Sequence, residues 1–343
     1  MMAAPTALRT STWTDFAMRP NLSSPEGIIP SSGPVCDCPD IIVSADPIDH
    51  PHQTLSTPES WHSQNAGTVY EGRPTYIYVR AKNFYDGSET GDVSLYYAPA
   101  ELIQWPSQWK QNRLRPQEAG DTVALRAHKR GGIAVGDNPF YWEAPPPSPN
   151  GHYCLFALVN TAHTKNPLPD NVPTSYKGMA DLVSNYLNIG WKNTAEVESD
   201  VPTWTRQSGL TVPDTCPLNQ RLMLSIIGSS GTVGGAVALS SSDTQFEPLI
   251  DLPETTIVDA NRPISFLTQP KRPTHATLNL TFWQHSSNPG LQDSIQLVAS
   301  WIPPDHESAA PYVDKGIAQR TATIDGDVFW TVPLGAMNYM FRR

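Results

Sequence analysis

At 343 residues the chain is long enough for two domains of ordinary size, and its 34 prolines and 22 glycines interrupt it too often for long helices. The formal net charge of −10, with only 23 Lys and Arg, excludes a general affinity for nucleic acid or anionic membranes, which need clustered positive charge. No apolar run approaches the roughly 18 residues of a transmembrane helix. Residues 1–20 lack the apolar region of a secretory signal, so we expect a cytoplasmic protein or one exported by a signal-peptide-independent route.

Residues 1–35 mix Pro, Ser, Thr and Ala with few periodic apolar residues, which predicts an extended N-terminal arm. Trp13, Phe16 and Met18 are its large apolar exceptions. They are candidates for contact with a partner or a neighbouring subunit. The alternative is an arm that packs on its own domain or is disordered.

Four segments have the patterns of β-strands, namely 76–83, 93–98, 152–159 and 188–193. In the first, Ile77, Val79 and Ala81 alternate with polar or aromatic residues, as in a half-buried strand. The third is apolar on both faces, which predicts a central strand that is covered on both sides. The only stretch that could hold more than a couple of helical turns is 176–186, which we expect in a crossover loop.

Several short runs between residues 36 and 198 resemble the bacterial immunoglobulin-like, adhesion-related (CARDB-like) β-sandwich module. They are Cys38-Pro39-Asp40-Ile41-Ile42-Val43, Trp109, Phe140-Tyr141-Trp142 and Asn188-Ile189-Gly190-Trp191-Lys192-Asn193. The resemblance covers a little under half of the chain. It implies a sandwich that contacts a ligand or partner and that has no catalytic residues of its own.

Cysteine and histidine residues offer two weak candidates for a metal site. Cys36, Cys38 and Cys216 could form a three-thiolate zinc site with a histidine, but structural zinc sites normally show C-x-x-C pairs. Reduced thiols, or one disulfide joining the two domains, are the favoured alternatives. His50 and His52 lie in a loop expected over 47–67, where a metal is again the weaker hypothesis. We therefore expect no metal and no cofactor.

After a polar linker over 199–214, residues 215–343 predict a second sandwich with a C-terminal hairpin. Its expected strands are 221–227, 236–239, 276–283 and 294–301. Asp325-Gly326 between two β-rich runs is the strongest hairpin signal in the chain. Met337, Tyr339 and Phe341 follow it and either complete this core, which we favour, or contact a partner.

Catalytic motifs are not fulfilled. The glycine-rich run 228–235 lacks the last glycine of a G-x-S-x-G nucleophile elbow and the lysine of a phosphate-binding loop. The sequence thus predicts an all-β protein of two tandem immunoglobulin-like antiparallel β-sandwich domains, over 36–198 and 215–343. We expect a non-enzymatic binding or assembly component of a bacterial secreted, surface or particle-associated system, with a protein partner or self-association. The alternatives are a toxin or effector active in residues 215–343 and a carbohydrate-binding accessory protein.

Overall fold

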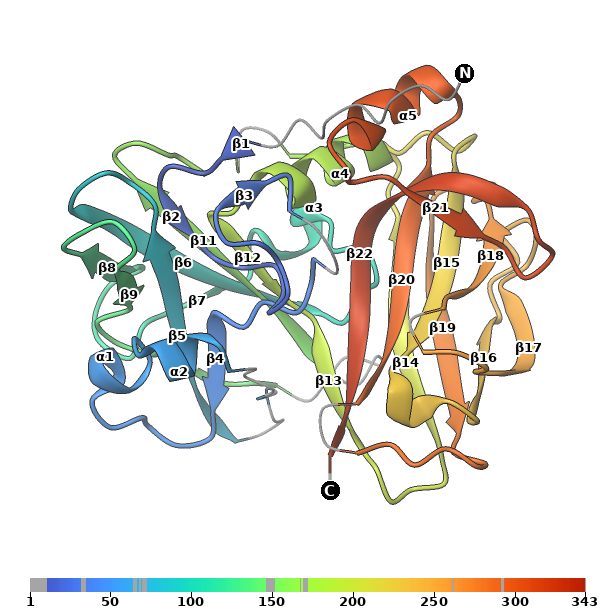
Figure 1. Ribbon diagram of the computed structural model, residues 1–343, viewed down its shortest axis with the longest axis horizontal. Helices are drawn as coiled ribbons and strands as arrows, with labels where there is room; N and C mark the ends of the chain where they lie inside the picture. The colour runs from blue at the N-terminus through green and yellow to red at the C-terminus, as the bar shows by residue number, and fades with distance from the viewer. Residues whose placement is uncertain are drawn as a thin grey trace, which may run out of the picture.

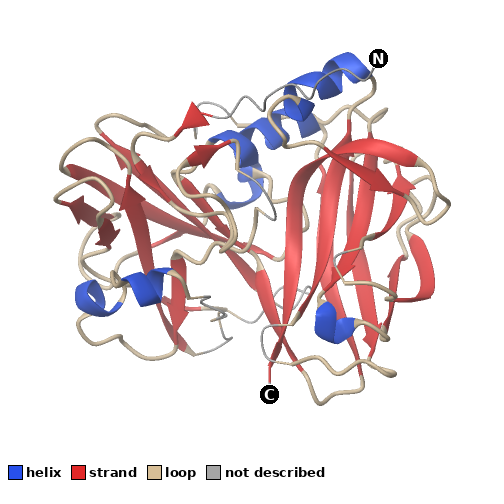
Figure 2. Ribbon diagram, viewed as in Figure 1, coloured by secondary structure: helices blue, strands red, loops and turns tan. Residues whose placement is uncertain are grey.

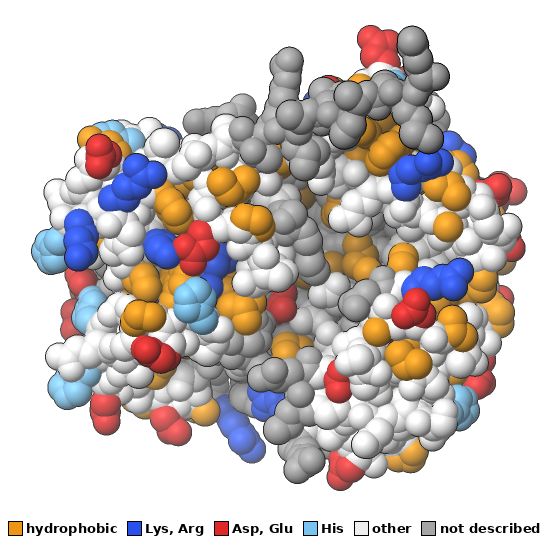
Figure 3. All heavy atoms as spheres, viewed as in Figure 1, with side chains coloured by type: hydrophobic (Ala, Val, Ile, Leu, Met, Phe, Trp, Pro, Cys, Tyr) orange, Lys and Arg blue, Asp and Glu red, His pale blue; other side chains and the backbone are white. Residues whose placement is uncertain are grey.

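Strands dominate the structure, a computed structural model that describes residues 11–31, 35–63, 67, 69, 73–145, 152–166, 168, 172–260, 262–290 and 293–342. They form two halves that lie side by side (Figures 1 and 2), as the space-filling view also shows (Figure 3). Among the described residues each half contains two large sheets, and the first half has an additional two-stranded one. Their ladders are antiparallel except for one parallel pair, so the expected all-β fold of two antiparallel sandwiches is confirmed. No described helix has the length and apolar character needed to cross a lipid bilayer.

The first sandwich consists of two five-stranded sheets. One sheet contains β2 (Phe16–Ala17), β4 (Ile41–Ser44), β5 (Pro74–Asn83), β9 (Ile133–Val135) and β10 (Phe140–Glu143). The other contains β6 (Glu89–Pro99), β7 (Arg113–Leu114), β8 (Val123–Ala127), β11 (Tyr153–Thr161) and β12 (Ile189–Lys192). A small ladder joins β1 (Ser11–Thr12) and β3 (Ile28–Ile29).

Strand β11 lies between β6 and β12 and is buried on both faces, as its sequence predicts. Leu155 and Val159 face the core between the two sheets. Phe156 and Leu158 face a second core, which is continuous with that of the other sandwich. The apolar character of both faces therefore reflects the packing of the two sandwiches against each other.

The second sandwich pairs a six-stranded sheet with a four-stranded one. The larger sheet contains β13 (Thr194–Glu198), β15 (Arg221–Gly228), β18 (Ile264–Thr268), β20 (Ser294–Ile302), β21 (Gln319–Ala322) and β22 (Val328–Arg342). The smaller contains β14 (Thr203–Val212), β16 (Ala236–Ser241), β17 (Asp251–Thr256) and β19 (Thr274–Trp283). Strands β21 and β22 form a hairpin across Asp325-Gly326, and the φ of +93° at Gly326 is one that glycine adopts without strain.

Helices are short and lie at the margins of the sheets (Figure 2). They are α1 (Pro51–Thr54), α2 (Pro58–Trp61), α3 (Pro106–Trp109), α4 (Tyr176–Asn185), α5 (His306–Val313) and a single 3₁₀ turn (Ser230–Thr232) in the glycine-rich run. The N-terminus of α4 is capped by the hydroxyl of Ser175, which accepts a hydrogen bond from the backbone N–H of Gly178 at 3.1 Å. Met179 and Leu182 bury the apolar face of this helix between the two sandwiches.

Residues 11–31 follow the alternative of an arm that packs on its own domain, because they lie against the first sandwich and contribute to its core. Strand β2 pairs with β5, with Phe16 opposite Asn83. Phe16 and Met18 are completely buried in the first core. Burial of such large apolar side chains outweighs the entropic cost of fixing a short segment, even where that segment shows no periodicity.

The linker expected over 199–214 is wrong, because most of it forms β14 at the edge of the four-stranded sheet. Its polar composition reflects an outer face in solvent, whereas Trp204, Leu210 and Val212 point into the core. The boundary at residue 198 is shifted as well. Strand β13 already runs parallel to β22 and so belongs to the second sandwich.

Candidate binding pocket

The arm residues proposed for partner contact instead make contacts within their own chain. Phe16 and Met18 are buried, and the indole nitrogen of half-buried Trp13 donates to the carbonyl of Phe16 at 2.8 Å. The C-terminal candidates Met337 and Tyr339 likewise have no exposed surface. Phe341 is also buried and packs edge-on against the core ring of Phe282. The C-terminal residues thus complete the second core, which was the favoured alternative.

The cysteine candidates do not come together. Cys36, Cys38 and Cys216 are buried free thiols, and no cluster of three potential metal ligands occurs among the described residues. Burial raises the pKa of the Cys38 thiol to about 12 and that of Cys216 to about 11, which keeps both protonated. Protonated, buried thiols are poor metal ligands and poor nucleophiles.

The two loop histidines lie at the surface around α1. His50 precedes the helix with a left-handed φ of 49°, and its side chain is exposed. His52 is also exposed, and its Nε2 lies 3.6 Å from a carboxylate oxygen of Asp137. Two exposed histidines and one distant carboxylate do not make a coordination shell.

A Cys, a His and an Asn meet at the junction of the sandwiches, a grouping that sequence inspection missed. The Cys154 thiol donates to Oδ1 of Asn193 at 2.6 Å, and Nε2 of His152 lies 3.2 Å from the same oxygen. The imidazole and the thiol therefore bind the amide rather than each other. Burial lowers the pKa of His152 to about 4 and raises that of Cys154 well above its ordinary value, so no thiolate–imidazolium pair forms.

A second polar cluster joins Glu101 of the first sandwich to β14 and β19 of the second. The hydroxyl of Thr211 lies 2.8 Å from Nδ1 of His275 and donates to Oε2 of Glu101 at 3.2 Å, while Glu101 Oε1 lies 3.3 Å from the same Nδ1. In a Ser-His-Asp type triad the acid and the nucleophile bind opposite ring nitrogens. Here the hydroxyl oxygen of Thr211 and the carboxyl oxygen of Glu101 both lie at Nδ1 of His275, so the geometry of a triad is not met. The cluster acts as a polar contact between the sandwiches.

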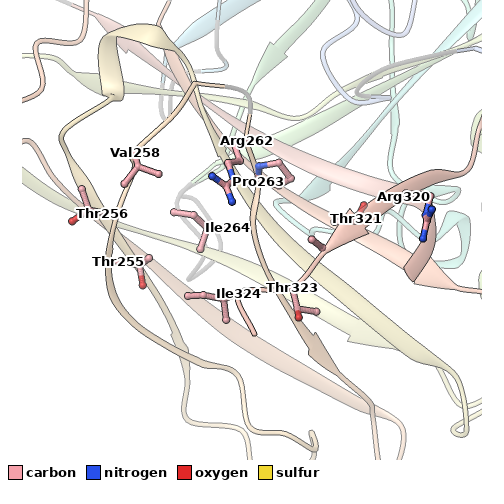
Figure 4. Close-up of a pocket in the computed structure, with 11 residues that line it drawn as sticks. Thr255, Thr256, Val258, Arg262, Pro263, Ile264, Arg320, Thr321, Thr323 and Ile324 are labelled. Carbon is pink, nitrogen blue, oxygen red and sulfur yellow. The ribbon is translucent and has the colours of Figure 1, made fainter. Parts of the chain in front are cut away.

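A pocket of about 480 Å³ opens at the lateral edge of the second sandwich, where β17, β18 and β21 approach one another. Figure 4 shows Thr255, Thr256 and Val258 on one side and Thr321 and Arg320 on the other. Ile264 and Ile324 lie between them, with Arg262 extending above Ile264 (Figure 4).

The walls of this pocket combine exposed apolar surface with two arginines that have no ionic partner among the described residues, one of which, Arg320, lies with its guanidinium 5.9 Å from the ring centroid of Trp330. Val258 is 69% exposed and Ile324 is 53% exposed, and both line this one pocket. Exposed apolar side chains that lie together, rather than singly, indicate an interaction surface. Arg262 and Arg320 line the pocket, no Asp or Glu does, and neither arginine forms an ion pair with a described residue.

Sequence reasoning identified the Asp325-Gly326 turn but not this pocket beside it. Ile324 directly precedes the turn and could have been noted as an apolar residue at an exposed hairpin tip. Arg262 and Val258 come from a loop about 60 residues earlier, and only the folded topology brings them close to β21.

Comparison with known proteins gives no family. No protein-family model matches the chain, and no curated protein is similar to it in sequence. Among solved structures, it is similar to the collagen adhesin CNA from S. aureus (7% identity, TM-score 0.22), covering 80% of this chain and 88% of that one. It is also similar to the MSCRAMM ACE from Enterococcus faecalis (9%, TM-score 0.23, covering 80% and 92%) and to the CupB6 tip adhesin from Pseudomonas aeruginosa (9%, TM-score 0.22, covering 81% and 93%). Scores of this size do not define a shared topology, so they carry no argument about binding.

Proposed function

We propose that this protein is a non-enzymatic binding or assembly component, and that it holds a protein partner at the pocket between β17, β18 and β21. One observation carries the proposal: the pocket joins exposed Val258 and Ile324 to two arginines without ionic partners. A combination of exposed apolar surface and arginine is typical of protein interaction sites. The geometry of the two polar clusters at the junction of the sandwiches supports a role without catalysis.

The cellular setting belongs to the same proposal. The resemblance of residues 36–198 to the CARDB-like module supports a bacterial secreted, surface or particle-associated system. The contacts between the sandwiches support a scaffold with a fixed shape. A continuous apolar core runs from β11 through α4 into the second sandwich, with the rings of Trp109 and Phe156 stacked at a centroid distance of 4.4 Å. Such a scaffold would present the pocket in one orientation.

Photo-crosslinking tests the location of the partner. A photoreactive benzoylphenylalanine is placed at exposed Thr256, which lines the pocket, and in a control at exposed Thr205 on β14, the opposite edge of the same sheet. We expect a discrete protein crosslink from position 256 only, and its loss when Val258→Asp is added. Equal crosslinking from both positions, no crosslink at all, or insensitivity to Val258→Asp would contradict the proposal.

A further inference from the structure

The edges of three strands line the pocket. Strand β17 pairs only with β16, β18 only with β15 and β21 only with β22 among the described strands. An edge strand leaves a row of backbone donors and acceptors that an extended peptide can match. The pocket therefore offers main-chain hydrogen bonds in addition to its side chains.

Within Gln319–Ala322 the edge of β21 forms no ladder with β18, although Ile324, two residues beyond it, is bonded to that strand. Pro253 interrupts β17 with a residue that has no N–H, and the register of its ladder shifts beside it. On β18, the carbonyl of Ser265 already accepts a hydrogen bond from the backbone N–H of Ile324 at 2.8 Å. Strand β21 (Gln319–Ala322) contains no proline.

The charge on the pocket walls selects for carboxylates. Arg262 and Arg320 have no acidic neighbour in the pocket, in a protein whose formal net charge is −10. A guanidinium binds a carboxylate with two parallel hydrogen bonds, which are stronger than those between neutral groups. Ile264 and Ile324 between them give apolar contact, so a matching segment carries both acidic and apolar side chains.

We propose that the partner segment is an extended acidic peptide that adds as a strand to the free edge of β21, with its carboxylates on Arg262 and Arg320. This inference rests on the proposed function, because it names the chemistry of the partner at the same pocket. None of the residues that line the pocket is aromatic, which argues against a carbohydrate, since sugars are generally bound against aromatic rings. In an extended peptide alternate side chains share one face, which suits a pattern of alternating acidic and apolar residues.

Fluorescence anisotropy with the purified full chain tests this chemistry. The probe is a fluorescein-labelled hexapeptide of alternating aspartate and leucine. Two matched peptides carry asparagine in place of aspartate, or N-methyl groups on alternate residues. We expect the acidic peptide to bind and each matched peptide to bind at least about tenfold more weakly, because each lacks one set of hydrogen bonds.

Protein variants locate the binding. Arg262→Gln and Arg320→Gln should each weaken binding of the acidic peptide at least about tenfold. Arg126→Gln, which removes an exposed arginine of the first sandwich, should not. All three side chains are exposed, so thermal unfolding of the variants should match that of the parent.

Four results would overturn the inference: equal binding of the acidic and asparagine peptides, insensitivity to either pocket arginine, undiminished binding of the N-methylated peptide, or no peptide binding. Heparin binding that depends on both arginines, without peptide binding, would also overturn it by indicating an anionic polysaccharide. Photo-crosslinking from position 256 distinguishes a failure of this inference from a failure of the proposed function. If that crosslink persists while the peptide fails, only the acidic extended segment is wrong, and if the crosslink also fails, the proposed function is wrong.

Discussion

The side-chain amide of Asn193 donates a hydrogen bond to the carbonyl oxygen of Ala336 at 2.7 Å, which joins the end of the first sandwich to the last strand of the chain. The same nitrogen donates to the carbonyl of Glu101 at 3.0 Å. Its Oδ1 binds the Cys154 thiol and the His152 ring. One buried amide thus satisfies polar groups from three separate segments, and among the common side chains only the carboxamides of Asn and the longer Gln have two N–H donors and an acceptor oxygen.

Asn193→Ala should therefore destabilise the protein by about 2–4 kcal/mol, because it removes the buried hydrogen bonds of one amide to two carbonyls, a thiol and an imidazole. Urea unfolding, followed by tryptophan fluorescence, measures the loss. The control is Asn138→Ala, whose side chain binds Glu118 at the exposed surface and should change stability by less than about 0.5 kcal/mol. Similar values for the two variants would contradict the role of Asn193.

Patterns with a clear period identified the framework of the fold. The alternating and doubly apolar runs gave β5 and β11, and the Asp325-Gly326 turn gave the β21–β22 hairpin. Each of these signals depends on residues that are close in the sequence. Local sequence is therefore sufficient for strands whose faces have uniform surroundings along their length.

Segments that depend on distant contacts were missed. Strand β14 has a polar solvent face and reads as a linker, and β2 is too short to show a period. The pocket and the Glu101 cluster depend on residues far apart in the chain. No local sequence pattern marks these residues as a site, because they come together only when the chain has folded.

A buried charge network fastens the N-terminal segment to the first sandwich, and removal of its central carboxylate should be costly. Asp40 binds Arg19 through Nη2 at 2.5 Å and Arg80 through Nε at 3.0 Å, and all three are at most 5% exposed. The guanidinium of Arg19 also lies 3.6 Å from the ring centroid of Trp61. We expect Asp40→Ala to lose about 3–5 kcal/mol, since two buried guanidinium groups would remain without their carboxylate.

An exposed ion pair provides the control for Asp40→Ala. Glu247 is 75% exposed and lies 3.2 Å from Lys271. Glu247→Ala should change the free energy of unfolding by less than about 1 kcal/mol, because water already solvates both charges. A loss of equal size in the two variants, measured by urea unfolding, would show that burial of the Asp40 network has no energetic effect.

The buried carboxyl of Glu101 should make stability depend on pH. Burial raises its pKa from 4.5 to about 8, against hydrogen bonds from Thr211 that lower it. The folded pKa lies above the unfolded one, so folding favours the protonated acid. This contribution is fully present below about pH 4.5 and is lost as the pH rises to about 8.

Glu101→Gln removes this titration. The stability of the variant relative to the parent should therefore increase between pH 4.5 and pH 8, by at most about 5 kcal/mol, and then level off. Urea unfolding at a series of pH values measures the difference. Glu254→Gln, in the exposed pair of His285 and Glu254 at 2.8 Å, is the matched control and should show no such increase. A difference between Glu101→Gln and the parent that stays constant with pH would contradict a buried, protonated carboxyl.

The four cysteines should behave as inert core residues in the native protein. All are buried, and burial raises the pKa of each thiol, for Cys216 to about 11 and for Cys38 to about 12. A thiol reagent such as dithionitrobenzoate reacts with the thiolate and needs access to it, so native protein at pH 8 should react only as fast as it unfolds. In denaturant, all four cysteine thiols should react with the reagent.

Neither a reductant nor EDTA should lower the melting temperature, because no disulfide and no metal would be lost. Rapid reaction of one native thiol, fewer than four thiols in denaturant, or destabilisation by EDTA would each show that a cysteine has a redox or metal-binding role.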